Sequence, residues 1–269
     1  MGGAARFCTA VKSYAHLNPI VLFSGDAFAP SIMSTFTKGE QMVPVLNKLG
    51  THCACYGNHD FDFGIETLEE LAEKTSFPWL MSNVTDNETG RPLAEGKITH
   101  VVEWWGRKIG LIGLAEKEWL DTLATVNPDE VTYTDYVLAG RMLGRELKEK
   151  GCDYVIALTH MRTPNDVRLA ELVDEIDLIL GGHDHVYEKK MVNGKYILKS
   201  GTDFRQFSVC HPDLHPGRGR RHQARRHCLH RGRRGHLRGR AGQRAGCRAQ
   251  KVHRQDGHGD DQGAGGVQG

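Results

Sequence analysis

The stretch CACYGNHDFDFG, residues 53–64, passes within a few positions from an apolar segment to a dense group of polar side chains. A short apolar run bounded by turn residues is consistent with a buried strand, so the polar group should lie at the carboxyl end of a strand. The potential ligand side chains that follow Tyr56 are Asn58, His59, Asp60 and Asp62. By themselves they fit either a metal site or a charged surface turn, and other segments of the chain are needed to distinguish the two.

Three further segments show the same order of an apolar strand and then a polar cluster. They are IVLFSGD, ending at Asp26; VIALTH, ending at His160; and LILGGHDH, with His183, Asp184 and His185. In open α/β sheets, ligands bind in the crevice outside the carboxyl ends of the strands. We therefore expect the four clusters to converge, which favours a metal site over separate surface turns.

The chemistry of these side chains indicates which metals they would bind. Imidazole, carboxylate and carboxamide groups without thiolates suit Mn, Zn, Fe or Mg better than a closed structural zinc site. A mixed set of this kind commonly holds two metals about 3.5 to 4 Å apart, which clamp a phosphoryl group and activate water. The clusters therefore indicate hydrolytic chemistry.

Periodicity assigns the remaining segments to helices and strands. Helices are predicted over 3–16, 65–75, 135–150 and 165–175; strands over 19–23, 51–56 and 79–81, and at the start of 153–160 and 177–185; a loop over 82–92; and hairpins over 99–115 and 187–201. The second hairpin has Asn193-Gly194 at its turn, a pair that suits type I′. Strands that alternate with helices and are followed by hairpins indicate an α/β fold with a mixed sheet.

Taken together, four motifs resemble those of a known family. SGDAFAPS (24–31), YGNHDFDFG (56–64), LTHM (158–161) and GGHDH (181–185) are similar to motifs of the calcineurin-like metallophosphoesterases, specifically the 5′-nucleotidase branch. The resemblance extends over roughly residues 2–209, and ordered motifs are more specific than any one of them. It implies a metallophosphoesterase-type four-layer α/β/β/α sandwich with mixed sheets. It also implies hydrolysis of phosphomonoesters, chiefly nucleotides, by a metal-bound hydroxide.

The same resemblance implies roles for individual residues. The implied metal ligands are Asp26, which bridges two metals, Asn58, His160 and His183 at one metal, and His185 at the other. His59 would be the catalytic acid, oriented by Asp62, while Asp60 is left without a clear role. Gly57 and Gly182 would allow close approach of the backbone. Asn58 and Arg162 would contact the substrate, although a solvated arginine explains Arg162 equally well.

The sequence departs from the family pattern upstream of Asp26. The family's first strand ends in an Asp-x-His motif whose two residues bind the metal that His185 also binds, and no Asp-x-His precedes Asp26 here. We therefore expect the first strand to be missing and one metal site to retain only Asp26 and His185. The alternative to an active hydrolase is a catalytically impaired or inactive fragment of one.

Residues 211–269 differ in composition from residues 1–210, which we expect to form the metallophosphoesterase domain. The tail carries 14 Lys and Arg against 4 Asp, including 13 Arg, with 13 Gly and 8 His, whereas residues 1–210 carry 21 basic and 29 acidic residues. No core can form from that composition, so a disordered tail is expected. The loss of residues with AT-rich codons indicates translation out of frame; the alternative is a basic segment that binds nucleic acid without sequence preference.

Other features of the chain exclude several classes. Seven cysteines with no Cys-x-x-Cys pair indicate neither a disulfide framework nor a zinc knuckle. No apolar run approaches the roughly 18 residues of a membrane span, and residues 1–17 lack the apolar core of a signal peptide. The expected partner is thus a small phosphoester rather than nucleic acid or a membrane, and the chain as written is expected in the cytoplasm. The oligomeric state is not indicated.

Overall fold

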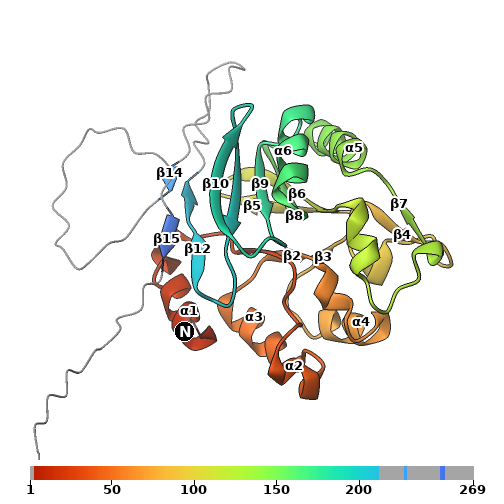
Figure 1. The fold of residues 1–269 in the computed structure, drawn as a ribbon. Helices are drawn as coiled ribbons and strands as arrows, with labels where there is room; N and C mark the ends of the chain where they lie inside the picture. Colours follow the sequence, from red (N-terminus) through yellow and green to blue (C-terminus); the bar gives the residue numbers. More distant parts are fainter. Residues whose placement is uncertain (1–2, 212–226, 229–248, 252–269) are drawn as a thin grey trace, which may run out of the picture.

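The computed structural model describes residues 3–211, 227–228 and 249–251. Its largest element is a six-stranded mixed sheet in the order β10-β11-β9-β8-β6-β5 (Figure 1). Its strands are β5 (Thr99–Trp104), β6 (Arg107–Ala115), β8 (Tyr154–His160), β9 (Leu178–Gly181), β10 (Tyr187–Val192) and β11 (Lys195–Ser200). The four central strands are parallel, and the two edge strands pair antiparallel with their neighbours as hairpins.

A second, three-stranded parallel sheet packs against the first. It contains β1 (Leu22–Ser24), β2 (Cys53–Cys55) and β3 (Trp79–Leu80), in that order. Side chains alternate across β2, as the pleat of a strand requires. Cys53 and Cys55 face the six-stranded sheet, whereas Ala54 faces the helices on the other side.

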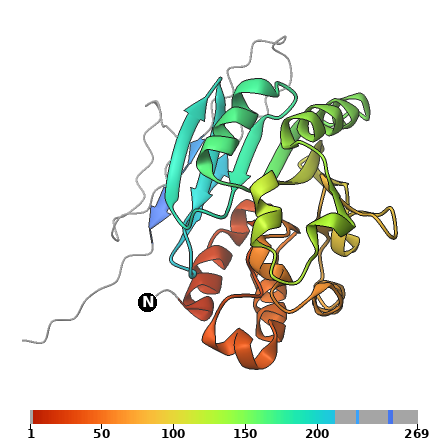
Figure 2. The same cartoon turned by 45° about the vertical axis from the view of Figure 1, so that its right-hand side comes forward.

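Helices cover the outer face of each sheet. The helices are α1 (Ala4–Lys12), α2 (Ile32–Thr37), α3 (Val43–Leu49), α4 (Ile65–Glu73), α5 (Tyr136–Glu149) and α6 (Thr163–Leu172). Figures 1 and 2 show α1 to α4 on the side of the small sheet and α5 and α6 on the far side of the large one. Three buried apolar clusters fill the spaces between the layers. The four-layer α/β/β/α sandwich is confirmed, with a mixed large sheet as predicted, whereas all three strands of the small sheet are parallel.

Local signals account for several boundaries. The Asp135 carboxylate caps α5 by accepting hydrogen bonds from the N–H groups of Val137 and Leu138. Asn193 and Gly194 both have positive φ, 47° and 73°, so the predicted type I′ turn between β10 and β11 is confirmed.

Other predictions were wrong in detail. The segment 82–92, predicted as a loop, contains β4 (Val84–Asp86), which pairs with β7 (Val131–Tyr133). Asn and Gly residues signal the turn that follows β4, but its partner strand lies more than 40 residues away. The first helix stops at Lys12, before the predicted end, and α2 and α3 were not predicted.

Two short strand pairs lie at the end of the described chain. Strand β12 (Gln206–Ser208) pairs with β15 (Ala249–Lys251), and β13 (Cys210–His211) pairs with β14 (His227–Cys228). The rest of the predicted Arg/Gly/His-rich tail lies outside the described residues, so its disorder stays a prediction. No helix within the described part is both long and apolar enough to cross a bilayer.

Candidate metal centre

The carboxyl ends of β1, β2, β8 and β9 meet where the two sheets face each other. The Ser24 hydroxyl at the end of β1 donates to the Leu180 carbonyl in β9 at 2.8 Å. The Ser24 carbonyl oxygen accepts a hydrogen bond from Nδ1 of His160 at the end of β8, also at 2.8 Å. These contacts join strands of different sheets and bring together loops that are up to 156 residues apart.

Four of the predicted ligands have donor atoms in one cluster. Nε2 of His160 lies 3.1 Å from Asp26 Oδ2 and 3.1 Å from Asn58 Oδ1. Nδ1 of His183 lies 3.2 Å from the same Asn58 oxygen. Asn58 and His160 are buried, and Asp26 and His183 are partly exposed. The cluster is therefore open to solvent on the side of Asp26 and His183.

The tautomer of His160 follows from its backbone contact. Because Nδ1 donates its proton to the Ser24 carbonyl, the neutral ring presents the lone pair of Nε2 to Asp26 and Asn58. Those two side chains also present oxygen lone pairs. A histidine whose second nitrogen donates to a carbonyl is the usual arrangement around a bound metal.

The donor set fits a divalent cation. Ligand bonds of about 2.0 to 2.2 Å place neighbouring donors roughly 3.0 to 3.5 Å apart in octahedral or tetrahedral geometry, and the observed separations are 3.1 and 3.2 Å. Within the described residues, no group of three or more His, Cys, Asp or Glu side chains is arranged to hold a metal. The cluster becomes a four-donor set only through the amide oxygen of Asn58.

Burial and neighbouring charges shift the pKa values of the side chains in the cluster. Burial would raise the pKa of Asp26, but His160 and the His59 N–H outweigh it and hold that pKa below its ordinary value. Burial would lower the pKa of His160, yet the Asp26 charge raises it above the ordinary value. Burial and the neighbouring His160 lower the pKa of His183.

Asp60, which the sequence left without a role, organises the loop that carries Asp26. Its buried carboxylate accepts hydrogen bonds from four backbone N–H groups, those of Asp26, Ala27, Phe28 and Gly57, at 2.7 to 3.0 Å. Asp26 itself has a φ of +58°, a left-handed conformation that is strained for most residues. The contacts to Asp60 hold this conformation. Burial and the Asp26 charge raise the pKa of Asp60 to about 6.

His59 and Asp62 form a pair at the edge of the cluster. Nδ1 of His59 lies 3.0 and 3.2 Å from the two oxygens of Asp62. The backbone N–H of His59 donates to Asp26 Oδ1 at 2.9 Å. The His59 side chain is 38% exposed, so its ring can reach a solvent-borne ligand while Asp62 holds its orientation.

His185 and Arg162 are placed differently from the other predicted residues. His185 is exposed, with a φ of +55°, and no hydrogen bond or ion pair joins it to the four donors among the described residues. The Arg162 guanidinium contacts Glu116 at 2.6 Å and Glu118 at 3.2 Å. A substrate phosphate would have to compete with these carboxylates for Arg162.

Glu116 is a residue that the sequence reading missed. It is 2% exposed, accepts from the Arg162 backbone N–H at 2.9 Å and lies 4.0 Å from His183 Nε2. Glu116 follows β6 directly, so the rule that identified the other clusters applied to it as well. A single glutamate after a strand was a weaker signal than a group of ligand-type residues.

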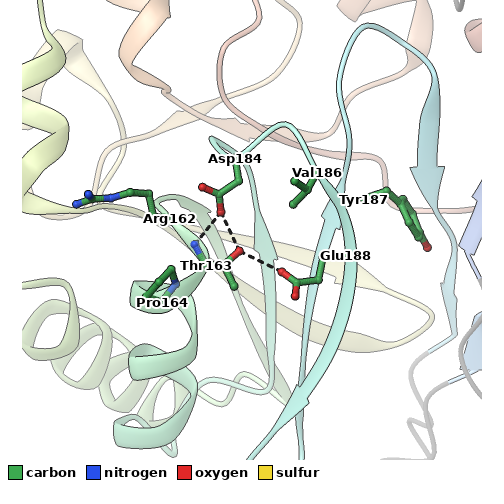
Figure 3. A pocket seen from close by; sticks show the side chains of 7 residues that line it. All are labelled: Arg162, Thr163, Pro164, Asp184, Val186, Tyr187 and Glu188. Carbon is green, nitrogen blue, oxygen red and sulfur yellow. Dashed lines mark hydrogen bonds between the residues drawn. The ribbon is translucent and has the colours of Figure 1, made fainter.

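A hollow of about 650 Å³ lies beside the cluster. It is lined by Arg162, Thr163, Pro164, Asp184, Val186, Tyr187 and Glu188. Figure 3 shows that Asp184 accepts hydrogen bonds from the N–H and the hydroxyl of Thr163, at 2.7 and 2.8 Å, and that the same hydroxyl contacts Glu188. Asp184 therefore links the loop after β9 to the start of α6.

The expected close approach of the backbone at two glycines is confirmed. A Cβ atom at Gly57 would lie 2.3 Å from Asp26 Oδ1, and one at Gly182 would lie 2.2 Å from the Ser24 carbonyl oxygen. Separations under 3.0 Å require something to move. At Gly182 the obstacle is backbone, which cannot rotate away.

We expect Gly182→Ala to reduce the rate of a reaction catalysed at this cluster by about 100-fold, because displacement of a positioned group by about 1 Å costs that much. The added methyl would push the loop that carries His183 away from Ser24 and His160. Turnover and thermal unfolding should be measured together. Gly50→Ala is the control, since it faces open space at φ +73° and should affect stability only. Unchanged turnover in Gly182→Ala would contradict the tight packing of this loop.

Comparison with known proteins shows which family has this arrangement. Residues 2–187 match the model of the family described as calcineurin-like phosphoesterase. The NAD 5′-nucleotidase of Haemophilus influenzae is 31% identical over 173 residues, which are 62% of this chain and 28% of that protein. The 5′-nucleotidase of Mus musculus is 29% identical over 231 residues, which are 78% of this chain and 38% of that protein. The chain thus spans about a third of the length of these relatives.

Solved structures share the fold. The Haemophilus influenzae NAD nucleotidase superposes with a TM-score of 0.70 at 22% identity, over 77% of this chain and 46% of that one. A calcineurin-like phosphoesterase from Bacillus subtilis superposes with a TM-score of 0.66 at 18% identity, over 78% and 76%.

Proposed function

The chain belongs to the calcineurin-like phosphoesterase family, and on that premise we propose that it hydrolyses phosphomonoesters, chiefly nucleotides, with a divalent metal ion. The observation that carries the proposal is the convergence of one carboxylate, one carboxamide and two imidazoles. His160 lies 3.1 Å from Asp26 and 3.1 Å from Asn58, and His183 lies 3.2 Å from Asn58. The names of the relatives support a nucleotide as the substrate. The alternative, an inactive or impaired fragment, predicts metal binding without turnover.

We propose Asp26, Asn58, His160 and His183 as the ligands of one divalent ion, which could be Mn, Zn, Fe or Mg. His185 stays a predicted ligand of a second ion. When bound, such ions would neutralise phosphoryl oxygens and lower the pKa of water. Asp60 holds the backbone beside Asp26, and Glu116 holds the backbone of Arg162, which follows His160 and Met161.

His59 is the proposed catalytic acid. With Nδ1 donating to Asp62, the ring carries any transferable proton on Nε2. Transfer of that proton to the leaving oxygen would neutralise the negative charge that develops there as the P–O bond breaks, so that a neutral alcohol departs. The contact with Asp62 keeps the His59 ring aimed in one direction.

The proposal is tested by phosphate release from 5′-AMP and from an aryl phosphate. Activity should disappear after treatment with a chelator and return with Mn²⁺, because the proposed mechanism needs the metal ion to activate water. Far-ultraviolet circular dichroism should show that the fold survives chelation. Turnover that is insensitive to chelation would contradict the metal-dependent mechanism, and metal binding without turnover would favour the inactive alternative.

A further inference from the structure

Lys199, at the end of β11, has a buried ammonium group surrounded by oxygen atoms. The residue is 1% exposed. Its Nζ donates to the carbonyl oxygens of Met161 at 2.6 Å and Gly182 at 2.7 Å. It also forms ion pairs with Asp166 and Asp184, each at 2.9 Å. Neither the sequence motifs nor the proposed catalytic steps account for this residue.

The two carbonyl oxygens that Lys199 binds belong to the two segments that carry the imidazoles. Met161 follows His160 directly, and Gly182 precedes His183 directly. One ammonium group therefore joins the backbone beside one imidazole to the backbone beside the other. Because both contacts are to main-chain carbonyls, they constrain the path of each loop and not only a side chain.

Two carboxylates balance the charge of the buried Lys199 ammonium group. A buried ammonium is costly unless it is paired and hydrogen-bonded. Asp166 is fully buried, accepts a hydrogen bond from Thr159 at 2.6 Å and supplies one negative charge. Asp184 supplies a second charge and is itself tied to Thr163. Lys199 and these two carboxylates thus connect the end of β8, the start of α6 and the loop after β9.

Lys195 provides a comparison within the same strand. It is also buried, at 7% exposed, and its Nζ donates to the carbonyl oxygens of Ala170 and Val173, near the end of α6. These contacts satisfy carbonyl groups at the end of a helix, and they involve neither of the segments that carry His160 and His183. Two buried lysines four positions apart in β11 therefore serve different parts of the molecule.

We propose that Lys199 is a positioning residue that sets the separation of the His160 and His183 imidazoles and thereby the affinity of the metal centre. The geometric part stands on the contacts alone, and the part about affinity rests on the proposed function. Outer partners of metal ligands typically change affinity by about 10- to 100-fold when removed. Loss of the Lys199 contacts should have an effect of this size.

The test compares Lys199→Met with Lys195→Met in the whole chain. In metal-free protein, the imidazole nitrogen resonances of His160 and His183 should shift or broaden in Lys199→Met and stay unchanged in Lys195→Met. The dissociation constant for Mn²⁺, measured by titration calorimetry, should rise by about 10- to 100-fold in Lys199→Met only. Thermal unfolding should show a loss of stability in both variants.

A second variant separates positioning from folding. Lys199→Met leaves Asp166 buried without its cation, so Lys199→Met combined with Asp166→Asn should recover thermal stability without recovering the resonances of the parent. Unchanged imidazole resonances in Lys199→Met, alone or combined with Asp166→Asn, would overturn the inference, whatever the activity of the parent. Absence of phosphate release by a parent with the expected resonance changes would count against the proposed function alone.

Discussion

Asn58→Ala should weaken Mn²⁺ binding and phosphate release by more than about 100-fold. The Asn58 oxygen is the shared neighbour of both imidazoles, at 3.1 Å from His160 and 3.2 Å from His183. Its removal takes away one of four donors and leaves a gap between the two rings. Removal of groups that merely support ligands costs about 10- to 100-fold in affinity, so loss of a ligand should exceed that range. Metal titration and initial rates measure the two effects.

Asn83→Ala is the matched control for this prediction. Asn83 is a second buried asparagine, and its side chain bonds the backbone of Ala115 and the carbonyl of Thr134. Its loss should lower the free energy of unfolding by about 1 to 3 kcal/mol through unsatisfied backbone groups, with metal affinity unchanged. If Asn58→Ala behaved like Asn83→Ala, with a loss of stability and normal metal affinity, the proposed centre would be wrong.

His59→Ala should lower turnover of 5′-AMP by about 100- to 10,000-fold, the usual contribution of a positioned acid. The effect should be much smaller for an aryl phosphate with a strongly electron-withdrawing ring, because that leaving oxygen departs without a proton. Metal affinity should change little, since the four donor atoms do not include the His59 ring. Rates with both substrates measure the contrast.

Two further variants sharpen the assignment of the acid. Asp62→Asn should cause a smaller loss with the same dependence on leaving group, because Asp62 acts through the His59 ring. His100→Ala removes a half-buried histidine of β5 and should leave both rates unchanged. An equal loss with both substrates in His59→Ala would point to substrate binding rather than proton transfer.

Much of the fold and of the donor cluster could be predicted from the sequence. Each polar cluster directly follows an apolar strand, so local pattern alone placed Asp26, Asn58, His160 and His183 at strand ends. The hairpin turn at Asn193-Gly194 was predictable because it depends on two adjacent residues with positive φ. Strand β4 was missed because its pairing with β7 leaves no mark on its own short segment.

The supporting contacts depended on tertiary structure. Asp60 and Asp62 stand two positions apart with the same side chain, yet Asp60 binds backbone 34 residues away while Asp62 holds the adjacent His59. Lys199 contacts Met161 across 38 residues, and His160 contacts Ser24 across 136. None of these pairs has a periodic signal in the chain.

The pattern of the sequence therefore determined the α/β fold and the residue types gathered at one edge of its sheets, and the resemblance of four motifs to a known family implied the sandwich. Spacing along the chain reports local backbone conformation and the side chains that share a face. Only the tertiary structure decided which carboxylate holds the Asp26 loop, which glutamate pairs with Arg162 and which lysine joins the two histidine loops. Those contacts arise when separate layers pack together, and the pairing of buried charges then depends on distances in space rather than on positions in the sequence.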